Sequence, residues 1–170
     1  MPESLRTRLR RYALNLFPAF WATGGRLVYI SHDWREVRLR IPLSWRTRNY
    51  VGTMFGGSMY GATDGIHMVM LIHALGPGYV VWDKAATIRF KKPGRSTLYA
   101  RFLLNDSDID QLRETLAHQP STERIFAVDL TGADGVVHAT VERTIYVRGP
   151  SDAPASSRNP APPSGSGGDQ

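Results

Sequence analysis

Apolar residues follow two different spacings along this 170-residue chain. Over residues 4–22, and again over residues 57–75, they recur at the spacing of a helix that buries one face. Elsewhere they alternate with polar residues, which is typical of strands with one buried side. The alternating segments lie at residues 27–30, 37–41, 79–91, 98–104, 124–131 and 136–147.

The order of these segments indicates a fold class. Alternating strands favour an antiparallel sheet with one face covered. The helix at 57–75 follows two strands and precedes four, so it can supply that cover. A short helix is also expected near Ser107, which forms a capping box with Asp110. We therefore predict an α+β domain in which a strongly curved antiparallel sheet wraps around one long central helix.

Composition divides the chain into three parts. We expect a basic amphipathic helix at residues 1–24, the folded domain at 25–148, and a disordered tail rich in Pro, Ser and Gly at 149–170. The absence of cysteine excludes disulfide scaffolds, thiolate metal sites and a cysteine nucleophile. The longest apolar run is too short to span a bilayer, and the N-terminus lacks the apolar core of a signal peptide. These features favour a cytoplasmic protein.

Positive charge is concentrated in the first third of the sequence. Residues 1–48 contain ten arginines against Glu3, Asp33 and Glu36, whereas the two signs nearly balance in the rest. One interpretation is a helix attracted to an anionic partner such as lipid headgroups, nucleic acid or a phosphorylated cofactor. The other is a helix that packs its apolar stripe against the domain and leaves its arginines in water. We favour the second and expect no nucleic acid, because no aromatic-basic motif accompanies the charge. Peripheral membrane contact through this helix remains the alternative.

The strongest chemical signal lies at the entrance of the central helix. Gly56 and Gly57 stand where a loop enters the helix, and the first N–H groups of a helix have no intrahelical partner. Such a group can stabilise a carbonyl oxygen that gains negative charge during acyl transfer. Asp64 lies two helical turns further along among largely apolar residues, where a carboxylate can act as base or nucleophile. A plain tight turn followed by a polar interruption is the alternative, but the whole spacing favours a site.

The run from Asn49 to Asp64 resembles the motif N-x-x-G-x-x-H-G-G-(six residues)-D of hotdog-fold acyl-CoA thioesterases of the phenylacetate-pathway and 4-hydroxybenzoyl-CoA type. The resemblance covers residues 25–148 and includes an F-x-x-P turn at 90–93. The runs GTMFGGSMYGATD and YVVWDKAATIRFKKPG are similar to a branch of hotdog proteins without an assigned activity. The resemblance implies that Asn49 orients the thioester or water, that the Gly56 N–H polarises the carbonyl, and that Asp64 attacks or activates water. Gly57 would support the turn.

The resemblance also implies a homodimer or dimer of dimers, with Asp64 facing the loop of a partner subunit. Two residues depart from the family. Phe55 replaces the histidine before Gly-Gly, and Asp83 falls near a position that is usually Ser or Thr. We expect Lys84 to form an ion pair with Asp83. Without that cation, Asp83 would be a second carboxylate near Asp64, and repulsion between the two negative charges would raise the pKa of one of them.

Three cations, Lys91, Lys92 and Arg95, cluster at a turn where they can hold the phosphates of coenzyme A. A solvated turn explains them equally well. His67 and His73 lie six residues apart and share no helix face, so no metal is expected. The sequence contains no Walker loop, and Gly56-Gly57 alone is no dinucleotide fingerprint, so we expect no other cofactor. The sequence thus predicts a hydrolase of acyl-CoA or related acyl thioesters. The alternative is a non-catalytic hotdog protein that binds fatty-acyl chains or lipid, which Phe55 favours.

Overall fold

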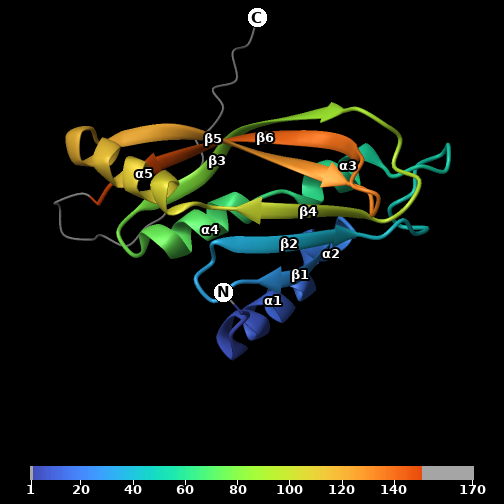
Figure 1. Cartoon of the computed structure of the whole chain (residues 1–170), viewed down its shortest axis with the longest axis horizontal. Coiled ribbons are helices and arrows are strands. Elements are labelled where there is room, and N and C mark those ends of the chain that lie inside the picture. Colours follow the sequence, from blue (N-terminus) through green and yellow to red (C-terminus); the bar gives the residue numbers. More distant parts are fainter. Residues whose placement is uncertain (1, 151–170) are drawn as a thin grey trace, which may run out of the picture.

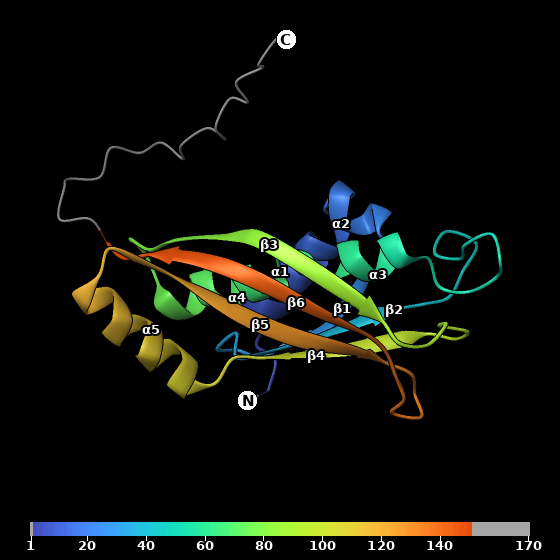
Figure 2. The same ribbon diagram turned by 90° about the horizontal axis from the view of Figure 1, so that it is seen from above.

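The computed structural model describes residues 2–150, which form one curved six-stranded antiparallel sheet with the central helices packed on one face (Figures 1 and 2). The strand order is β1-β2-β4-β5-β6-β3. All but the first two residues of the predicted tail lie outside the described part. The elements are α1 (Leu5–Leu16), α2 (Pro18–Ala22), β1 (Arg26–Ile30), β2 (Glu36–Ile41), α3 (Gly56–Ala62), α4 (Ile66–Leu75), β3 (Val80–Phe90), β4 (Leu98–Leu103), α5 (Asp106–His118), β5 (Ser121–Thr131) and β6 (Val137–Arg148).

The alternation seen in the sequence corresponds to the two faces of this sheet. On β2, which pairs with β4 from Glu36↔Leu103 to Ile41↔Leu98, every second residue is buried. β5 and β6 form the hairpin expected around residues 132–135, and β6 also pairs along its length with β3. The buried face packs on the central helical segment (Figure 1), so the predicted α+β fold class is confirmed.

The central helical segment is interrupted where the sequence predicted continuity. α3 ends at Ala62 and α4 begins at Ile66, with Thr63–Gly65 between them. Gly65 has a positive φ of 67°, a left-handed conformation that glycine adopts at little cost. Its N–H donates to Asp83 Oδ2 at 3.1 Å, so a contact with the sheet replaces the helical hydrogen bond.

The start of α5 also differs from the expected capping box. Asn105 is the cap, and its partner is Asp108 rather than the predicted pair of Ser107 and Asp110. Asp108 Oδ2 accepts from the Asn105 N–H at 2.9 Å. The helix therefore begins two residues earlier than that pair implied.

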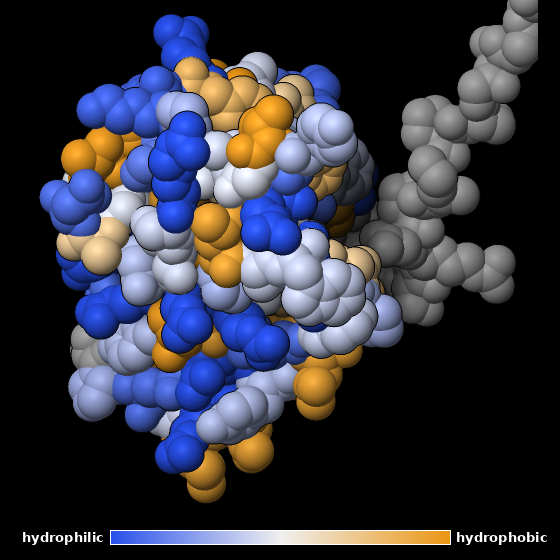
Figure 3. All heavy atoms as spheres, turned by 90° about the vertical axis from the view of Figure 1, so that its right-hand side faces the viewer, coloured by the Kyte–Doolittle hydropathy of each residue, from blue (hydrophilic) through white to orange (hydrophobic). Residues whose placement is uncertain are grey.

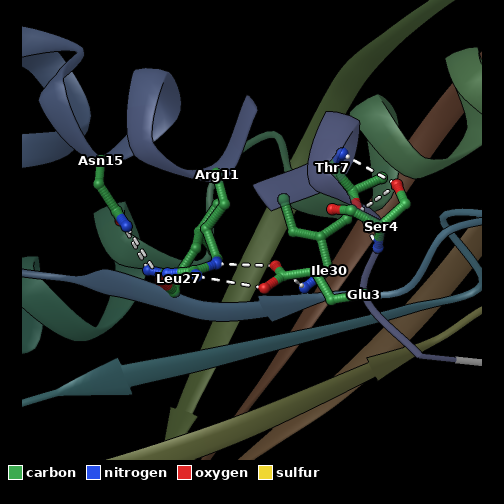
Figure 4. Close-up of polar contacts among 7 residues, drawn as sticks. All are labelled: Glu3, Ser4, Thr7, Arg11, Asn15, Leu27 and Ile30. Carbon is green, nitrogen blue, oxygen red and sulfur yellow. Dashed lines mark hydrogen bonds and ion pairs between the residues drawn. The ribbon is translucent and has the colours of Figure 1, made fainter. Parts of the chain in front are cut away.

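The N-terminal helix is docked opposite to the orientation we favoured. Its apolar stripe faces outward: Leu5 is 74 % exposed and Leu16 is 76 % exposed. Its polar face points to the sheet instead, where Arg11 pairs with Glu3 and Asn15 bonds to β1 (Figure 4). The helix also ends earlier than residue 22, because Pro18 starts the separate helix α2.

The inverted orientation follows from the position of β1 at one end of the sheet. An edge strand presents backbone groups that no other strand satisfies. The Asn15 side chain accepts from the Leu27 N–H at 2.8 Å and donates to the Leu27 carbonyl at 2.9 Å, as a neighbouring strand would. Glu3 accepts from the Ile30 N–H at 3.3 Å and pairs with Arg11 at 2.8 Å. Polar side chains are thus required on the inner face of α1.

Replacing Asn15 by Ala should lower the free energy of unfolding by about 1–3 kcal/mol, because the half-buried backbone of Leu27 loses both partners. Urea denaturation followed by circular dichroism measures the change. Leu9→Ala, on the exposed face of the same helix, is the matched control and should alter stability far less. Equal losses in the two variants would contradict the role of Asn15.

Candidate functional site

A buried arginine ties the interruption of the central helix to the sheet. Arg143 lies on the inward face of β6 and is 3 % exposed. Its Nη1 is 2.6 Å from Asp64 Oδ1 and 3.7 Å from Asp83 Oδ2. Its Nη2 donates to the Tyr60 carbonyl at 3.0 Å and to Thr63 Oγ1 at 3.4 Å. One guanidinium therefore holds the end of α3, the connecting turn and β3 together.

The two carboxylates beside Arg143 differ in their surroundings. The Asp64 side chain is 64 % exposed, whereas that of Asp83 is 18 % exposed. Burial raises the pKa of Asp83, and the charge of Asp64 adds to this, while Arg143 and the Gly65 N–H act in the opposite direction. Asp83 Oδ1 has no hydrogen-bond partner among the described residues. Asp64 is thus the carboxylate available to solvent, and Asp83 is a structural neighbour.

The expected pairing of Asp83 with Lys84 is wrong. Lys84 forms an ion pair with Glu123 of β5, and the pairing of β3 with β6 is irregular between Asp83 and Ala85. The offsetting cation is Arg143 instead. A signal for it exists in the sequence: position 143 falls between Val141 and Ile145 on the apolar face of the last strand, where a charged residue needs a buried partner.

The loop before α3 is closed by its own side chains. Asn49 Oδ1 accepts from the Thr53 N–H at 3.0 Å, and Asn49 Nδ2 donates to Thr53 Oγ1 at 2.9 Å. The loop is anchored at its end, where Met54 N–H donates to the Gly94 carbonyl at 2.7 Å. The Asn49 amide therefore shapes the loop, and its predicted role toward substrate stays a prediction.

Four of the predicted site residues line one cleft of about 370 Å³: Asn49, Gly56, Lys91 and Lys92. Gly56 opens α3, so its N–H lacks an intrahelical acceptor. A Cβ at Gly56 would lie 2.8 Å from the Phe90 ring, which explains glycine at this position. Arg95 is exposed but does not line the cleft.

Phe55 and Gly57 form the outer side of the same helix entrance. The Phe55 ring lies over Gly57, where a Cβ would come within 2.4 Å of it, and Phe55 is 53 % exposed. Gly57 thus leaves room for an aromatic ring at the position where the thioesterase motif has histidine.

Asp64 lies at a different cavity, which the sequence did not reveal. This cavity, of about 350 Å³, lies between the N-terminal helices, β1, β2 and the interrupted central helix. Asp64 and Gly65 form part of its wall. Most of the other lining residues are apolar, among them Leu14, Phe17, Phe20, Trp34 and Val69. Within one chain, the carboxylate and the Gly56 amide therefore belong to separate cavities.

The helix histidines are structural. His67 is buried between the rings of Phe102 and Phe126, and burial lowers its pKa to about 4. His73 stacks on Trp34. Residues 2–150 contain no cluster of three or more His, Asp or Glu side chains arranged to hold a metal ion. None of the helices described there is both long and apolar enough to cross a membrane.

The family of the chain is shown by a sequence model for a domain of unknown function, DUF4442, which matches residues 6–147. The chain belongs to the DUF4442 family. Among curated proteins, none matches its sequence. The family assignment agrees with the resemblance to a hotdog branch without an assigned activity.

Solved structures resemble this DUF4442 protein over most of its length. The Pseudomonas aeruginosa protein PA5026, of unknown function and described as a probable thioesterase, is 23 % identical with a TM-score of 0.74, covering 88 % of this chain and 98 % of its own. Thioesterase HI1161 of Haemophilus influenzae is 16 % identical with a TM-score of 0.60, and the match covers 81 % of this chain and 87 % of HI1161. A hypothetical thioesterase of Streptococcus pneumoniae, solved with coenzyme A, is 19 % identical with a TM-score of 0.57. That match covers 84 % of this chain and 98 % of the Streptococcus protein. These neighbours confirm the hotdog fold.

Replacing Arg143 by Ala should destabilise this DUF4442 protein by about 3 kcal/mol, because the mostly buried Asp83 loses its cation. Urea denaturation monitored by tryptophan fluorescence measures the loss. Lys84→Ala breaks the exposed pair with Glu123 and serves as the control, with an expected loss below about 1 kcal/mol. A loss no larger in the Arg143 variant than in the control would show that the guanidinium is not a structural anchor.

Proposed function

We propose that this DUF4442 protein hydrolyses acyl-CoA or a related acyl thioester, with Asp64 as the base or nucleophile. One observation carries the proposal: an exposed carboxylate, fixed by a buried arginine, forms part of the wall of an apolar cavity. An acyl chain suits such a cavity, since ligand pockets are mostly apolar with few polar groups. The hotdog thioesterases among the structural neighbours support the same chemistry.

The contact with Arg143 occupies only one carboxylate oxygen of Asp64 and leaves the other free to react. Arg143 binds Oδ1, and no hydrogen bond joins Oδ2 to another described residue. Oδ2 is therefore available to take a proton from water or to attack the thioester carbon. The carbonyl oxygen would accept from the Gly56 N–H, which stabilises the negative charge that develops there. If Asp64 acts as base, water adds to the carbonyl carbon, the C–S bond breaks, and the thiol leaves with the proton that Asp64 had taken. If Asp64 attacks, the thiolate leaves and takes a proton from solvent, and water then hydrolyses the resulting anhydride to the carboxylic acid and the free Asp64 carboxylate.

A homodimer would join the two parts of this site. β3 ends the sheet, is 11 residues long and carries the exposed side chains of Trp82 and Phe90. A long unpaired edge of this kind is suited to pairing with another strand. Pairing of two copies through β3 would bring Asp64 of one subunit toward the cleft at Gly56 of the other. We therefore include the homodimer in the proposal.

Lys91 and Lys92 are proposed to hold the phosphates of coenzyme A. Both are exposed and line the cleft next to Gly56, and their N–H groups bond to the His138 carbonyl at 2.8 and 3.1 Å. The turn is therefore fixed while the ammonium groups remain free for a ligand. The Streptococcus pneumoniae neighbour that was solved with coenzyme A supports this assignment. Arg95 would add to the same positive turn.

A non-catalytic acyl-binding protein is the second candidate function. The observation that favours it is the Phe55 ring over Gly57, which places a hydrocarbon surface where the motif has a hydrogen-bonding histidine. Native mass spectrometry that finds a retained fatty acid, with no thiol release from any acyl-CoA, would support this candidate over hydrolysis.

Asp64→Asn should reduce kcat for acyl-CoA hydrolysis by at least about 100-fold, because the amide cannot act as base or nucleophile. Thiol release is measured across acyl chains from acetyl to palmitoyl and across aromatic acyl groups. The control is Asp110→Asn on the exposed face of α5, which should retain full activity. Unchanged turnover in the Asp64 variant would reject the proposed role of this carboxylate.

Filling the apolar cavity should shorten the preferred acyl chain. Ala19 lines the cavity from α2 yet is exposed on its other side, so Ala19→Trp can narrow the cavity without disturbing the core. We expect kcat/KM to fall by about fourfold for each methylene that is excluded, with little change for acetyl-CoA. Ala13→Trp, on α1 outside the cavity, is the control. A uniform loss for all chain lengths would show that the acyl group binds elsewhere.

A further inference from the structure

The outward face of the N-terminal helices carries large apolar side chains that no other described element covers. Their exposed fractions range from 48 % to 76 %. The residues are Leu5, Leu9, Tyr12, Leu16, Phe17 and Trp21. We call this set the outer face of α1–α2. A surface of contiguous large apolar residues is typical of a site that contacts a partner or a membrane.

The inner side of the same helix explains why this face cannot turn inward. Asn15 and Glu3 satisfy the backbone of the edge strand β1, as Figure 4 shows, and rotation of α1 would leave the Leu27 and Ile30 N–H groups unpaired. Burial of the apolar stripe in this chain would therefore cost several buried hydrogen bonds. A contact that covers the outer face would therefore come from outside residues 2–150.

The charges around the outer face are positive. Arg6 and Arg8 are exposed, and neither forms a salt bridge within residues 2–150. Figure 1 places α1 at the lower margin of the molecule. At the same margin in Figure 3, hydrophobic and hydrophilic side chains project next to one another.

All three acidic residues in the first 48 positions are engaged elsewhere. Glu3 pairs with Arg11, Glu36 pairs with Arg38 and Arg101, and Asp33 accepts from Ser31 and from the Arg35 N–H. None of these three carboxylates forms an ion pair with Arg6 or Arg8, although Asp33 lines a pocket together with Arg6.

This charge favours one occupant over a second copy of the chain. A two-fold contact places the same surface against itself, which would bring Arg6 and Arg8 of both copies together although neither forms an ion pair with a described carboxylate. A bilayer with anionic lipids offers the complementary charge together with an apolar interior. Helices with one cationic and one apolar side bind in the plane of such interfaces.

We propose that the outer face of α1–α2 docks this protein on the surface of an anionic lipid bilayer. The leucines and Phe17 enter the boundary between headgroups and acyl chains, while Arg6 and Arg8 extend to the lipid phosphates. Trp21, with the Arg46 guanidinium 3.8 Å from its ring centroid, and Trp45, which is 83 % exposed, suit the interfacial region. Phe17 also lines the apolar cavity, so the docking surface adjoins that cavity.

Flotation of the full chain with lipid vesicles tests the proposal. We expect binding to vesicles of phosphatidylglycerol and phosphatidylcholine in equal amounts, binding reduced by salt, and little binding to phosphatidylcholine alone. Arg6→Gln with Arg8→Gln should weaken the partition constant about fivefold for each arginine. Leu9→Gln with Leu16→Gln should weaken it at least about tenfold.

Two matched variants control for general loss of charge or hydrophobicity. Ile125→Gln removes an apolar residue that is 68 % exposed on β5, and Arg113→Gln with Arg148→Gln removes two exposed arginines on α5 and β6. Both should bind vesicles like the parent, and circular dichroism should show all variants folded.

Several outcomes would overturn the proposal. Equal binding to the two vesicle types would show that anionic headgroups do not contribute to docking, which contradicts the proposal. Equal loss in the control variants would show that the outer face is not the docking site. Absence of vesicle binding would overturn it outright. If sedimentation then showed an oligomer that Leu9→Gln with Leu16→Gln disrupts, the occupant of the outer face would be a second copy.

Discussion

The buried guanidinium of Arg143 is the interaction on which the arrangement of this domain depends. A cation on the inward face of a central strand must be compensated, and each of its contacts fixes a different element. Asp64 and the carbonyl of Tyr60 belong to the interrupted central helix, and Asp83 belongs to the edge strand β3. The interruption of the helix thus lies at the same contact, where Gly65 also donates to Asp83. It brings Asp64 out of a continuous helix to a position where solvent and the apolar cavity both reach it.

A second constraint acts at the opposite edge of the sheet. β1 has no further strand beside it, and α1 satisfies its backbone with Asn15 and Glu3. Asn15 and Arg11 of the helix thus face the sheet edge, and Leu5, Leu9 and Leu16 remain exposed. The two edges of one sheet therefore have different uses. β3 has no neighbouring strand on its outer side within residues 2–150, whereas β1 is covered by a helix whose other side is exposed.

The candidate site is divided between these two regions. Gly56, Lys91 and Lys92 share one cleft, while Asp64 lies at the wall of another cavity that α1 and α2 complete. The N-terminal helices contribute both to that cavity and to the exposed apolar surface, and Phe17 belongs to both. A hydrolase of acyl thioesters and a lipid-docking surface are thus compatible on this scaffold, since each uses the hydrocarbon character of the same helices.

The sequence by itself determined the strands, the hairpin at 132–135 and the fold class, because alternation of apolar residues records which side of a strand is buried. It also singled out Gly56 and Asp64 through their spacing, and Asn49 through the resemblance to the thioesterase motif. It did not reveal the orientation of α1, the partner of Asp83 or the cavity beside Asp64. Each of these depends on groups far apart in the chain: the unpaired backbone of β1 selects the inner face of α1, and Arg143 lies 79 residues from Asp64. Helical spacing shows that a helix has an apolar stripe, but only the tertiary structure decides which side faces the domain, since buried backbone hydrogen bonds outweigh the stripe at this edge.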